Sequence, residues 1–403
     1  MMTGRGFSYA LLTVLVYLIL AYSGFSLLFV LFFVLLLLPP LSALQLLWAG
    51  RRLSIAQVLD PGDVERGEPA RLTVSLRQHG WLSHGELDLV IGKPGLRGQI
   101  IYERHTLPLL AGVPAELAVE VDCRHRGHYP VGISSIRARD VLGLFYLPLR
   151  SRAVCRRQMP TCCILPHPEV IPGTEDLASL LADWQHRQTQ NYGDEIDAVA
   201  NLRAHRPGDS LKRTHWKVSA RLNEIMIKEF ENPIQREGLL VLDLERPTGS
   251  SGNRAGLTLG DFYMDRAAYL IQMALATGNH LRVVAYQADG RHEHLTTATG
   301  DLRAMQYALT DLDWADGWPA DLVLQEETAH NQPAWFVILL ACHLSEAAAR
   351  QLQDLQNRGV LTSLILVGDA AGDAAEDAAL AVLAAQRIPC IRISPAGGQS
   401  DVP

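Results

Sequence analysis

The sequence lacks the cysteine arrangements that build metal sites or disulfide frameworks. Its six cysteines are scattered, none forms a C-x-x-C pair, and the adjacent Cys162 and Cys163 are poorly spaced to ligate one tetrahedral ion. Scattered thiols of this kind fit a reducing compartment, where they pack as small hydrophobic side chains. The sequence also lacks an excess of positive charge, with a net charge of −7 and a pI near 6.1. Because nucleic-acid-binding proteins present basic surfaces, we expect no nucleic-acid partner.

Several enzyme motifs are missing as well. The absence of G-x-x-x-x-G-K-[ST] excludes a P-loop NTPase, and the absence of G-x-S-x-G excludes a nucleophile elbow. The glycines of residues 249–256 do not match G-x-G-x-x-G, so this run predicts a loop. A local group of Cys123, His125 and His128 lacks a fourth ligand and is interleaved with arginines, which favours a solvated strand end over zinc.

Charge is absent from two long apolar runs, residues 7–22 and 25–38, and the second continues past a Pro-Pro pair to Trp48. A membrane-spanning helix needs about 20 apolar residues, so residues 7–48 hold two spans with a break at Tyr22-Ser23-Gly24. We therefore predict a transmembrane hairpin over residues 1–52. A cleaved signal peptide is the alternative, but no small-x-small cleavage site precedes the second apolar block.

Arginines flank both ends of this hairpin. Arg5 precedes the first span, and Arg51 and Arg52 follow the second. Under the positive-inside rule both ends face the cytoplasm. We therefore expect a multi-pass protein of the inner (cytoplasmic) membrane with its soluble domains in the cytoplasm.

Short alternating runs follow the hairpin. Period-two alternation, interrupted by Pro-Gly and Lys-Pro-Gly turns, is found in four segments: Ala70–Gln78, Gly85–Gly92, Ala115–Arg124 and Val131–Asp140. Strands at this spacing predict a β-sandwich-like domain over residues 53–165.

From Gly238 onward, near-continuous apolar strands alternate with helical segments. This pattern predicts an α/β doubly wound parallel sheet over residues 238–396, followed by a flexible tail at 397–403. Ligands of such sheets bind beyond the carboxyl ends of the strands, which here are the loops after Asp243, His343 and Asp369. Residues 166–237 are left as a linker that carries a further dense motif.

That motif lies within residues 193–231. Pro207-Gly208 predicts a turn, and Asp209 or Ser210 then caps a helix. One face of this helix carries residues four apart: Asp209, Arg213, Lys217 and Arg221. An apolar face carries Leu211, Val218 and Leu222, and a strand with Ile225, Ile227 and Phe230 follows.

The motif forms a basic cluster in an acidic protein, and two interpretations stay open. In the first, Asp194, Glu195, Glu224 and Glu229 neutralise the cluster within the fold. In the second, the cluster is an exposed docking face for an acidic partner or an anionic headgroup. The candidate partner-binding residues are Arg203, Arg206, Gly208, Asp209, Arg213, Trp216, Lys217, Ser219 and Arg221.

The same residues resemble the signature of domain-of-unknown-function family 58, which is described as von Willebrand factor A-like. The matching residues are Arg203-Ala-His205-Arg-Pro207-Gly208-Asp209, Arg213, Trp216-Lys217 and Ser219-Ala220-Arg221, with His205 where the family has tyrosine. The paired apolar runs and the segment Asp140-Val-Leu-Gly-Leu-Phe145 match as well. The resemblance implies a cytoplasmic A-like domain on a membrane hairpin that works beside a MoxR-type AAA+ ATPase in assembling or remodelling other proteins.

One departure concerns the cation site of such domains, which carry D-x-S-x-S after the first strand. This chain has Asp243-Leu-Glu245-Arg-Pro247, and Pro247 has no side-chain oxygen. The later strand ends in Cys342-His343 where an acid would complete the shell. Because Mg²⁺ needs several oxygen ligands, we expect a degenerate site around Asp243 and Glu245, with no metal and no cofactor.

These observations favour a non-catalytic, membrane-anchored adaptor or assembly factor. Two alternatives remain: a hydrolase that acts on cell-envelope precursors through the strand-end loops, and a cation-dependent adhesion module.

Overall fold

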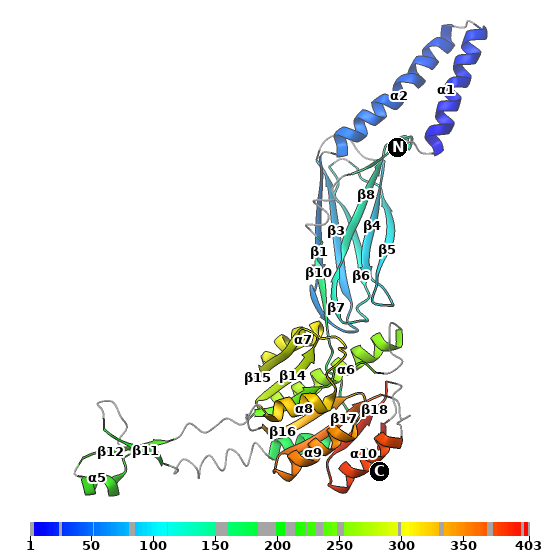
Figure 1. Ribbon diagram of the computed structural model, residues 1–403. Coiled ribbons are helices and arrows are strands. Elements are labelled where there is room, and N and C mark those ends of the chain that lie inside the picture. The colour runs from blue at the N-terminus through cyan, green and yellow to red at the C-terminus, as the bar shows by residue number, and fades with distance from the viewer. Residues whose placement is uncertain are drawn as a thin grey trace. The chain divides into compact units, whose positions relative to one another are not determined.

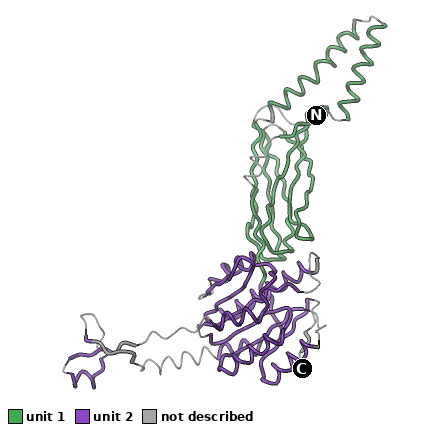
Figure 2. The backbone as a smooth tube through the Cα atoms, in the orientation of Figure 1, with its two compact units in different colours: residues 1–167 green, residues 168–403 purple. Residues whose placement is uncertain are grey.

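The chain divides into two compact units, residues 1–167 and 168–403 (Figure 2). The computed structural model describes residues 4–23, 26–50, 52–79, 85–110, 112–149, 159–183, 199–205, 214–222, 224–230, 237–247, 254–296, 300–329, 334–368, 374–395 and 399–401.

Two helices open the first unit, α1 (Gly4–Ser23) and α2 (Ser26–Gly50) (Figure 1). Both are long and apolar enough to cross a membrane, and most of their large apolar side chains are exposed. Helix α1 continues through Tyr22 and Ser23 of the predicted break, and α2 begins at Ser26. Helix α2 runs on through Pro39 and Pro40, residues that apolar helices tolerate when neighbouring groups satisfy the freed carbonyls.

The rest of the first unit is rich in strands. Two antiparallel sheets have the orders β1-β3-β6 and β5-β4-β8-β9, and a small third sheet has the order β2-β10-β7. The bounds are β1 Leu53–Asp60, β2 Asp63–Glu65, β3 Ala70–Gln78, β4 Glu86–Pro94, β5 Ile100–Leu107, β6 Ala115–Val121, β7 Gly127–Pro130, β8 Gly132–Arg139, β9 Tyr146–Pro148 and β10 Thr161–Leu165.

The two larger sheets share one hydrophobic core. Alternate residues of β3, such as Leu72 and Val74, are fully buried with Leu89 of β4 and Ile133 of β8. Burying one face of each strand explains the period-two pattern of the sequence. Cys123 is buried in this core beyond the end of β6, so it does not share a strand with His125.

The second unit is built on a seven-stranded sheet of order β15-β14-β13-β16-β17-β18-β19. Strands β14, β13, β16, β17 and β18 are parallel, whereas β15 and β19 are antiparallel to their neighbours. The bounds are β13 Glu237–Leu242, β14 Leu281–Gln287, β15 Gly290–Thr296, β16 Ala334–Ala341, β17 Leu361–Val367, β18 Cys390–Ile393 and β19 Gln399–Asp401.

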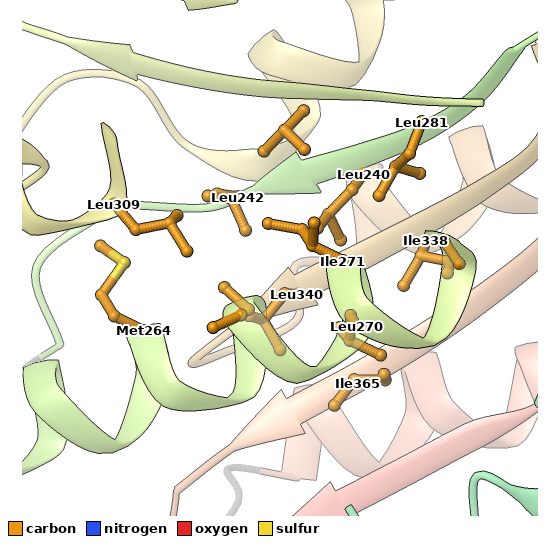
Figure 3. Packing of buried hydrophobic residues seen from close by; sticks show 14 of the residues in the cluster. Leu240, Leu242, Met264, Leu270, Ile271, Leu281, Leu309, Ile338, Leu340 and Ile365 are labelled. Carbon is orange, nitrogen blue, oxygen red and sulfur yellow. The ribbon is translucent and has the colours of Figure 1, made fainter. Parts of the chain in front are cut away.

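Helices cover both faces of this sheet, as predicted. Helices α6 (Arg254–Ala276) and α7 (Asp301–Asp311) pack on one face, where Ile271 lies close to Leu240 and Leu340 (Figure 3). The other face is covered by α8 (Ala320–Ala329), α9 (Glu346–Asn357) and α10 (Ala374–Ala385). Residues 254–256, which the sequence assigns to a loop, begin α6.

Part of the predicted linker belongs to the α/β core. Residues 175–183 are helical, and Leu177 and Leu181 are buried in the cluster on the α6 face together with Ile171. The Arg266 guanidinium of α6 holds the start of this segment by donating to the carbonyls of Glu169 and Val170 at 2.7 and 2.9 Å.

Candidate functional site

The basic motif forms a small structural module, here called the signature module and described for residues 199–205, 214–222 and 224–230. Strands β11 (Val199–Ala204) and β12 (Met226–Phe230) pair antiparallel. Thr214 pairs with Ile227 on the other edge of β12, and the His215 amide donates to the Met226 carbonyl at 2.8 Å. Strand β12 is therefore held along both of its edges.

The helix of the module is shorter than the sequence predicts. Helix α5 spans Trp216–Leu222, whereas the prediction starts it at Asp209 or Ser210. Thr214 and His215 are extended because their backbone groups are hydrogen-bonded to β12. The predicted stack of four charged residues on one helix is therefore wrong, and only Lys217 and Arg221 share α5.

Ser219 fixes α5 to the strands. Its hydroxyl donates to the His215 carbonyl at 3.0 Å and accepts from the Met226 amide at 2.9 Å. Ser219 is buried, so its hydroxyl positions the helix instead of forming an exposed contact. The His215 ring completes the joint because its Nδ1 accepts from the Val218 amide at 3.3 Å.

Replacing Ser219 with alanine should loosen this joint. The Met226 amide loses its acceptor, and an unsatisfied buried donor costs about 1–3 kcal/mol. We expect faster hydrogen exchange at the Met226 amide with little change at amides of β16. Ser179→Ala is the matched control, since Ser179 is exposed on the helix of residues 175–183 and its hydroxyl donates locally to the Asp176 carbonyl. Unchanged exchange at Met226 would contradict the positioning role.

The outer face of α5 is both apolar and basic. Trp216 is 65% exposed and Leu222 58% exposed, and Lys217 and Arg221 are exposed beside them. Leu222, which the sequence places on an apolar face of the helix, is exposed, because the seven-residue helix buries only Ser219. An exposed tryptophan flanked by two cations is a surface that a partner can cover.

The structure places the remaining candidate residues as follows. Arg203 lies on β11 opposite Ile227. Four predicted partner-binding residues lie outside the described residues: Arg206, Gly208, Asp209 and Arg213. Of the acids proposed to neutralise the cluster, Glu224 is exposed and Glu229 lies on β12 opposite Asn201, whereas Asp194 and Glu195 are outside the described residues.

A second cluster lies at the carboxyl ends of β13 and β16, which are neighbours in the sheet. The chain leaves β13 toward β14 on one side and leaves β16 toward β17 on the other, so this is the topological switch point where α/β sheets bind ligands. The structure brings Asp243 and His343 together here, and the His343 Nε2 lies 3.2 Å from the Glu245 carboxylate. The third predicted loop begins at Asp369, outside the described residues.

Asp243 is the most deeply placed acid of this cluster, at 1% exposure. Its Oδ1 accepts from the Glu245 amide at 3.0 Å, but within the described part of the chain its Oδ2 has no hydrogen-bond partner. Burial raises the pKa of Asp243 to about 7, and the nearby Glu245 and Asp321 carboxylates add to that effect against the opposing charge of His343.

Tyr263 of α6 anchors the backbone around this acid. Its hydroxyl lies 2.8 Å from the Asp243 carbonyl and 2.6 Å from the Leu340 carbonyl. The ring is fully buried and meets Trp314 edge to face at a centroid distance of 5.2 Å. Burial holds the pKa of Tyr263 well above its usual range, so the hydroxyl remains a neutral donor. The strand ends are therefore a rigid frame.

The residues at the switch point do not fit a divalent cation. Hard cations take six or more oxygen ligands, and Asp243 offers a single uncommitted carboxylate oxygen. Glu245 faces the His343 ring, and Pro247 has no side-chain oxygen. Across the described ranges, no group of three or more His, Cys, Asp or Glu residues is placed to hold a metal ion.

Sequence reasoning missed a buried ion network beside this sheet. Glu327 of α8 has a fully buried side chain that accepts from Tyr286 at 2.9 Å and from Arg291 at 2.6 and 2.9 Å. The buried Arg282 lies 3.6 Å away. These bonds hold the β14–β15 hairpin to α8, and nothing in the local sequence pairs residues so far apart.

The comparisons with known proteins bear on the signature module first. The family model described as "Protein of unknown function DUF58" matches residues 201–332. This range includes most of that module, strands β13 to β15 and helices α6 to α8. Residues 201–332 therefore form a DUF58 region within the chain. No curated protein matches the chain.

Likenesses to solved structures are small and partial. A CARDB domain from Pyrococcus furiosus is 17% identical, with coverage of 22% of this chain and 71% of that one and a TM-score of 0.17. The alkylpurine DNA glycosylase AlkC from Pseudomonas fluorescens is 14% identical, with coverage of 24% and 29% and a TM-score of 0.17. A β-glucosidase from Listeria innocua is 9% identical, with coverage of 24% and 15% and a TM-score of 0.16. Likeness at this level carries no conclusion about the DUF58 fold or function.

Proposed function

We propose that this protein is a membrane-anchored, non-catalytic adaptor that docks a partner protein through the outer face of α5. The observation that carries the proposal is the exposed Trp216 on the same short helix as two exposed cations, Lys217 and Arg221. Tryptophan and arginine are the residues most enriched among those that dominate binding energy at interfaces. A partner that complements this face has an acidic surface around an apolar pocket.

The module is prepared for binding before any partner arrives. Two hydrogen bonds, from the Met226 amide to Ser219 and from the His215 amide to Met226, join this segment to β12. Two more join His215 to the first turn of α5, so the helix is already ordered. Ordering a helix only on binding would cost free energy that a preformed helix saves. The ordered helix supports specific recognition of one partner surface and argues against a purely electrostatic, non-specific attraction.

The resemblance to DUF58 proteins makes a MoxR-type AAA+ ATPase the expected partner, and the missing P-loop assigns any ATP hydrolysis to that partner. We also propose that the α/β region is von Willebrand factor A-like. Numbered in chain order, its central strands have the order 3-2-1-4-5-6, with the third strand antiparallel, which supports that assignment. The two apolar helices form a hairpin in the inner membrane in this proposal, with the soluble regions in the cytoplasm.

Reversing the two exposed charges tests the docking face. The double variant Lys217→Glu, Arg221→Glu should abolish co-purification with the ATPase from membranes solubilised in mild detergent, because it presents two acids to an acidic partner surface. Trp216→Ala should weaken the same capture by removing the apolar anchor. The matched control is Arg350→Glu, an equally exposed arginine on α9 of the same unit.

Three results would count against the proposal. Unchanged capture of the ATPase by the double variant would remove α5 as the docking face. An equal loss of capture with Arg350→Glu would show that the effect comes from net charge and not from the position of Lys217 and Arg221. A reporter fused at residue 60 and located outside the inner membrane would separate the protein from an ATP-dependent partner altogether.

A further inference from the structure

A second unusual surface lies in the first unit, at the turn between β8 and β9. The Gly143 amide donates to the Asp140 carbonyl at 3.0 Å, which closes a four-residue turn with Val141 and Leu142 at its centre. Gly143 has a φ of +69°, the left-handed conformation that closes such a hairpin. The Phe145 amide donates to the Asp140 carboxylate at 2.8 Å, so the turn has one fixed shape.

The two central residues of this turn are apolar although they are exposed. Central turn positions usually carry Pro, Asn, Asp, Ser or Gly, because they are exposed and tightly bent. Here Val141 is 58% exposed and Leu142 is 46% exposed, whereas Leu144 of the same turn is buried. The two neighbouring branched side chains form a small exposed apolar patch that projects from the turn.

Both apolar helices reach this turn. The Asp140 carboxylate accepts a hydrogen bond from the Ser42 hydroxyl of α2, and both side chains are buried. One helical turn later, Leu46 enters the hydrophobic core of the strand-rich region. At the start of α1, the Arg5 guanidinium lies beside the turn, 3.5 Å from where a Cβ on Gly143 would be. The turn is thus fixed beside both helices.

These contacts locate the edge of the hydrocarbon layer. Placing an Arg or Asp side chain at the centre of a bilayer costs about 2.5–3.5 kcal/mol or more, so Arg5 and Asp140 belong at or outside its boundary. The apolar stretch of α1 begins at Phe7, two residues after Arg5. The apolar stretch of α2 passes Ser42 and continues through the exposed Leu44 and Leu47 to Trp48. The boundary therefore passes close to the turn itself.

We propose that the Val141–Leu142 turn inserts into the lipid at the membrane surface, on the side where α1 begins and α2 ends. Lipid at the boundary between headgroups and acyl chains covers Val141 and Leu142, and α1 and α2 cross the same boundary in this proposal. The inference rests on the membrane hairpin of the proposed function but is independent of any protein partner. The turn would act as a third attachment point that fixes the strand-rich region against the bilayer.

Photocrosslinking from the turn tests this directly. The full chain, with Leu142 replaced by p-benzoylphenylalanine, is reconstituted into vesicles of phosphatidylcholine and phosphatidylglycerol and irradiated. Intact-protein mass spectrometry then measures lipid adducts. Leu96 is the matched control, because it is a similarly exposed leucine in the turn after β4. Strand β4 starts beside Asp140, and its nine residues span about 30 Å. Leu96 therefore lies at the opposite end of the strand from the Val141–Leu142 turn. Val34, exposed in the middle of α2, is the positive control.

We expect strong lipid adducts from positions 142 and 34 and only background adducts from position 96. Adducts at 34 without adducts at 142 would overturn the proposal, and so would crosslinks from 142 to a second copy of the chain. Equal yields at 142 and 96 would overturn it too, since they indicate random contact. An absence of adducts at both 142 and 34 would remove the membrane hairpin as well, whereas loss of the ATPase partner alone leaves these yields unchanged.

Discussion

Glu327→Ala should lower the local free energy of unfolding of the β14–β15 hairpin by about 3 kcal/mol, because it removes the one fully buried counter-charge of Arg282 and Arg291. Both arginines keep the partly exposed Glu293 as a second partner, so the expected loss is at the lower end for a broken buried ion pair. The Tyr286 hydroxyl also loses its acceptor. Native-state hydrogen exchange of the β14 amides measures this local stability without assuming a single unfolding transition for a chain of two units.

Glu346→Ala is the control for the Glu327 variant. Glu346 forms an exposed i,i+4 ion pair with Arg350 on α9, and such pairs contribute about 1 kcal/mol or less. Comparable losses from the two variants would show that the network around Glu327 behaves like a surface pair. A conservative Glu327→Gln variant keeps the shape but removes the charge, so it separates the loss of packing from the loss of counter-charge.

Asp243→Asn should stabilise the α/β unit, and the gain should grow as the pH rises from 5 to 8. The folded-state pKa of Asp243 is about 7, raised from an ordinary value of 3.8. The folded protein therefore binds this proton more tightly than the unfolded chain, and stability is lost as the pH rises through 7. The full penalty above pH 7 is roughly 4 kcal/mol, and an amide of the same shape removes it. The thermal midpoint at each pH measures the effect.

Asp289→Asn is the control for the Asp243 variant, because folding shifts the pKa of Asp289 in the opposite direction. The pKa of the exposed Asp289 is lowered by its hydrogen bond to His292, so amidation should bring no gain at high pH. Loss of stability for Asp243→Asn at pH 8 would mean that the carboxylate is stabilised in the folded state. A bound cation would do that, and added Mg²⁺ would then raise the midpoint of the unsubstituted protein.

The interior of both units could be predicted from the sequence, whereas their edges could not. The prediction for β3 covers Ala70–Gln78, the observed strand, and the buried strands of the α/β sheet are near-continuous apolar runs. Strand β15 was missed because its polar residues carry no apolar pattern, and it is a strand only through its pairing with β14. Strand propensity depends strongly on such neighbours.

The candidate site could be predicted only in part, for a similar reason. Charged residues spaced four apart predicted a helix through Arg213, but backbone pairing of Thr214 and His215 with β12 delays its start to Trp216. That pairing joins residues 11 or more positions apart, which helical periodicity does not register. The meeting of Asp243 with His343 was expected from sheet topology, since both follow neighbouring parallel strands.

In the membrane arrangement that we propose, helix α2 continues beyond the bilayer. It runs unbroken from Ser26 to Gly50, with Ser42 bonded to Asp140 and Leu46 embedded among the strands. The strand-rich region is consequently attached to α2 by direct side-chain contacts in addition to the chain connection. Any change in the tilt of α2 within the bilayer, such as one imposed by a thicker or thinner membrane, would turn that region with it.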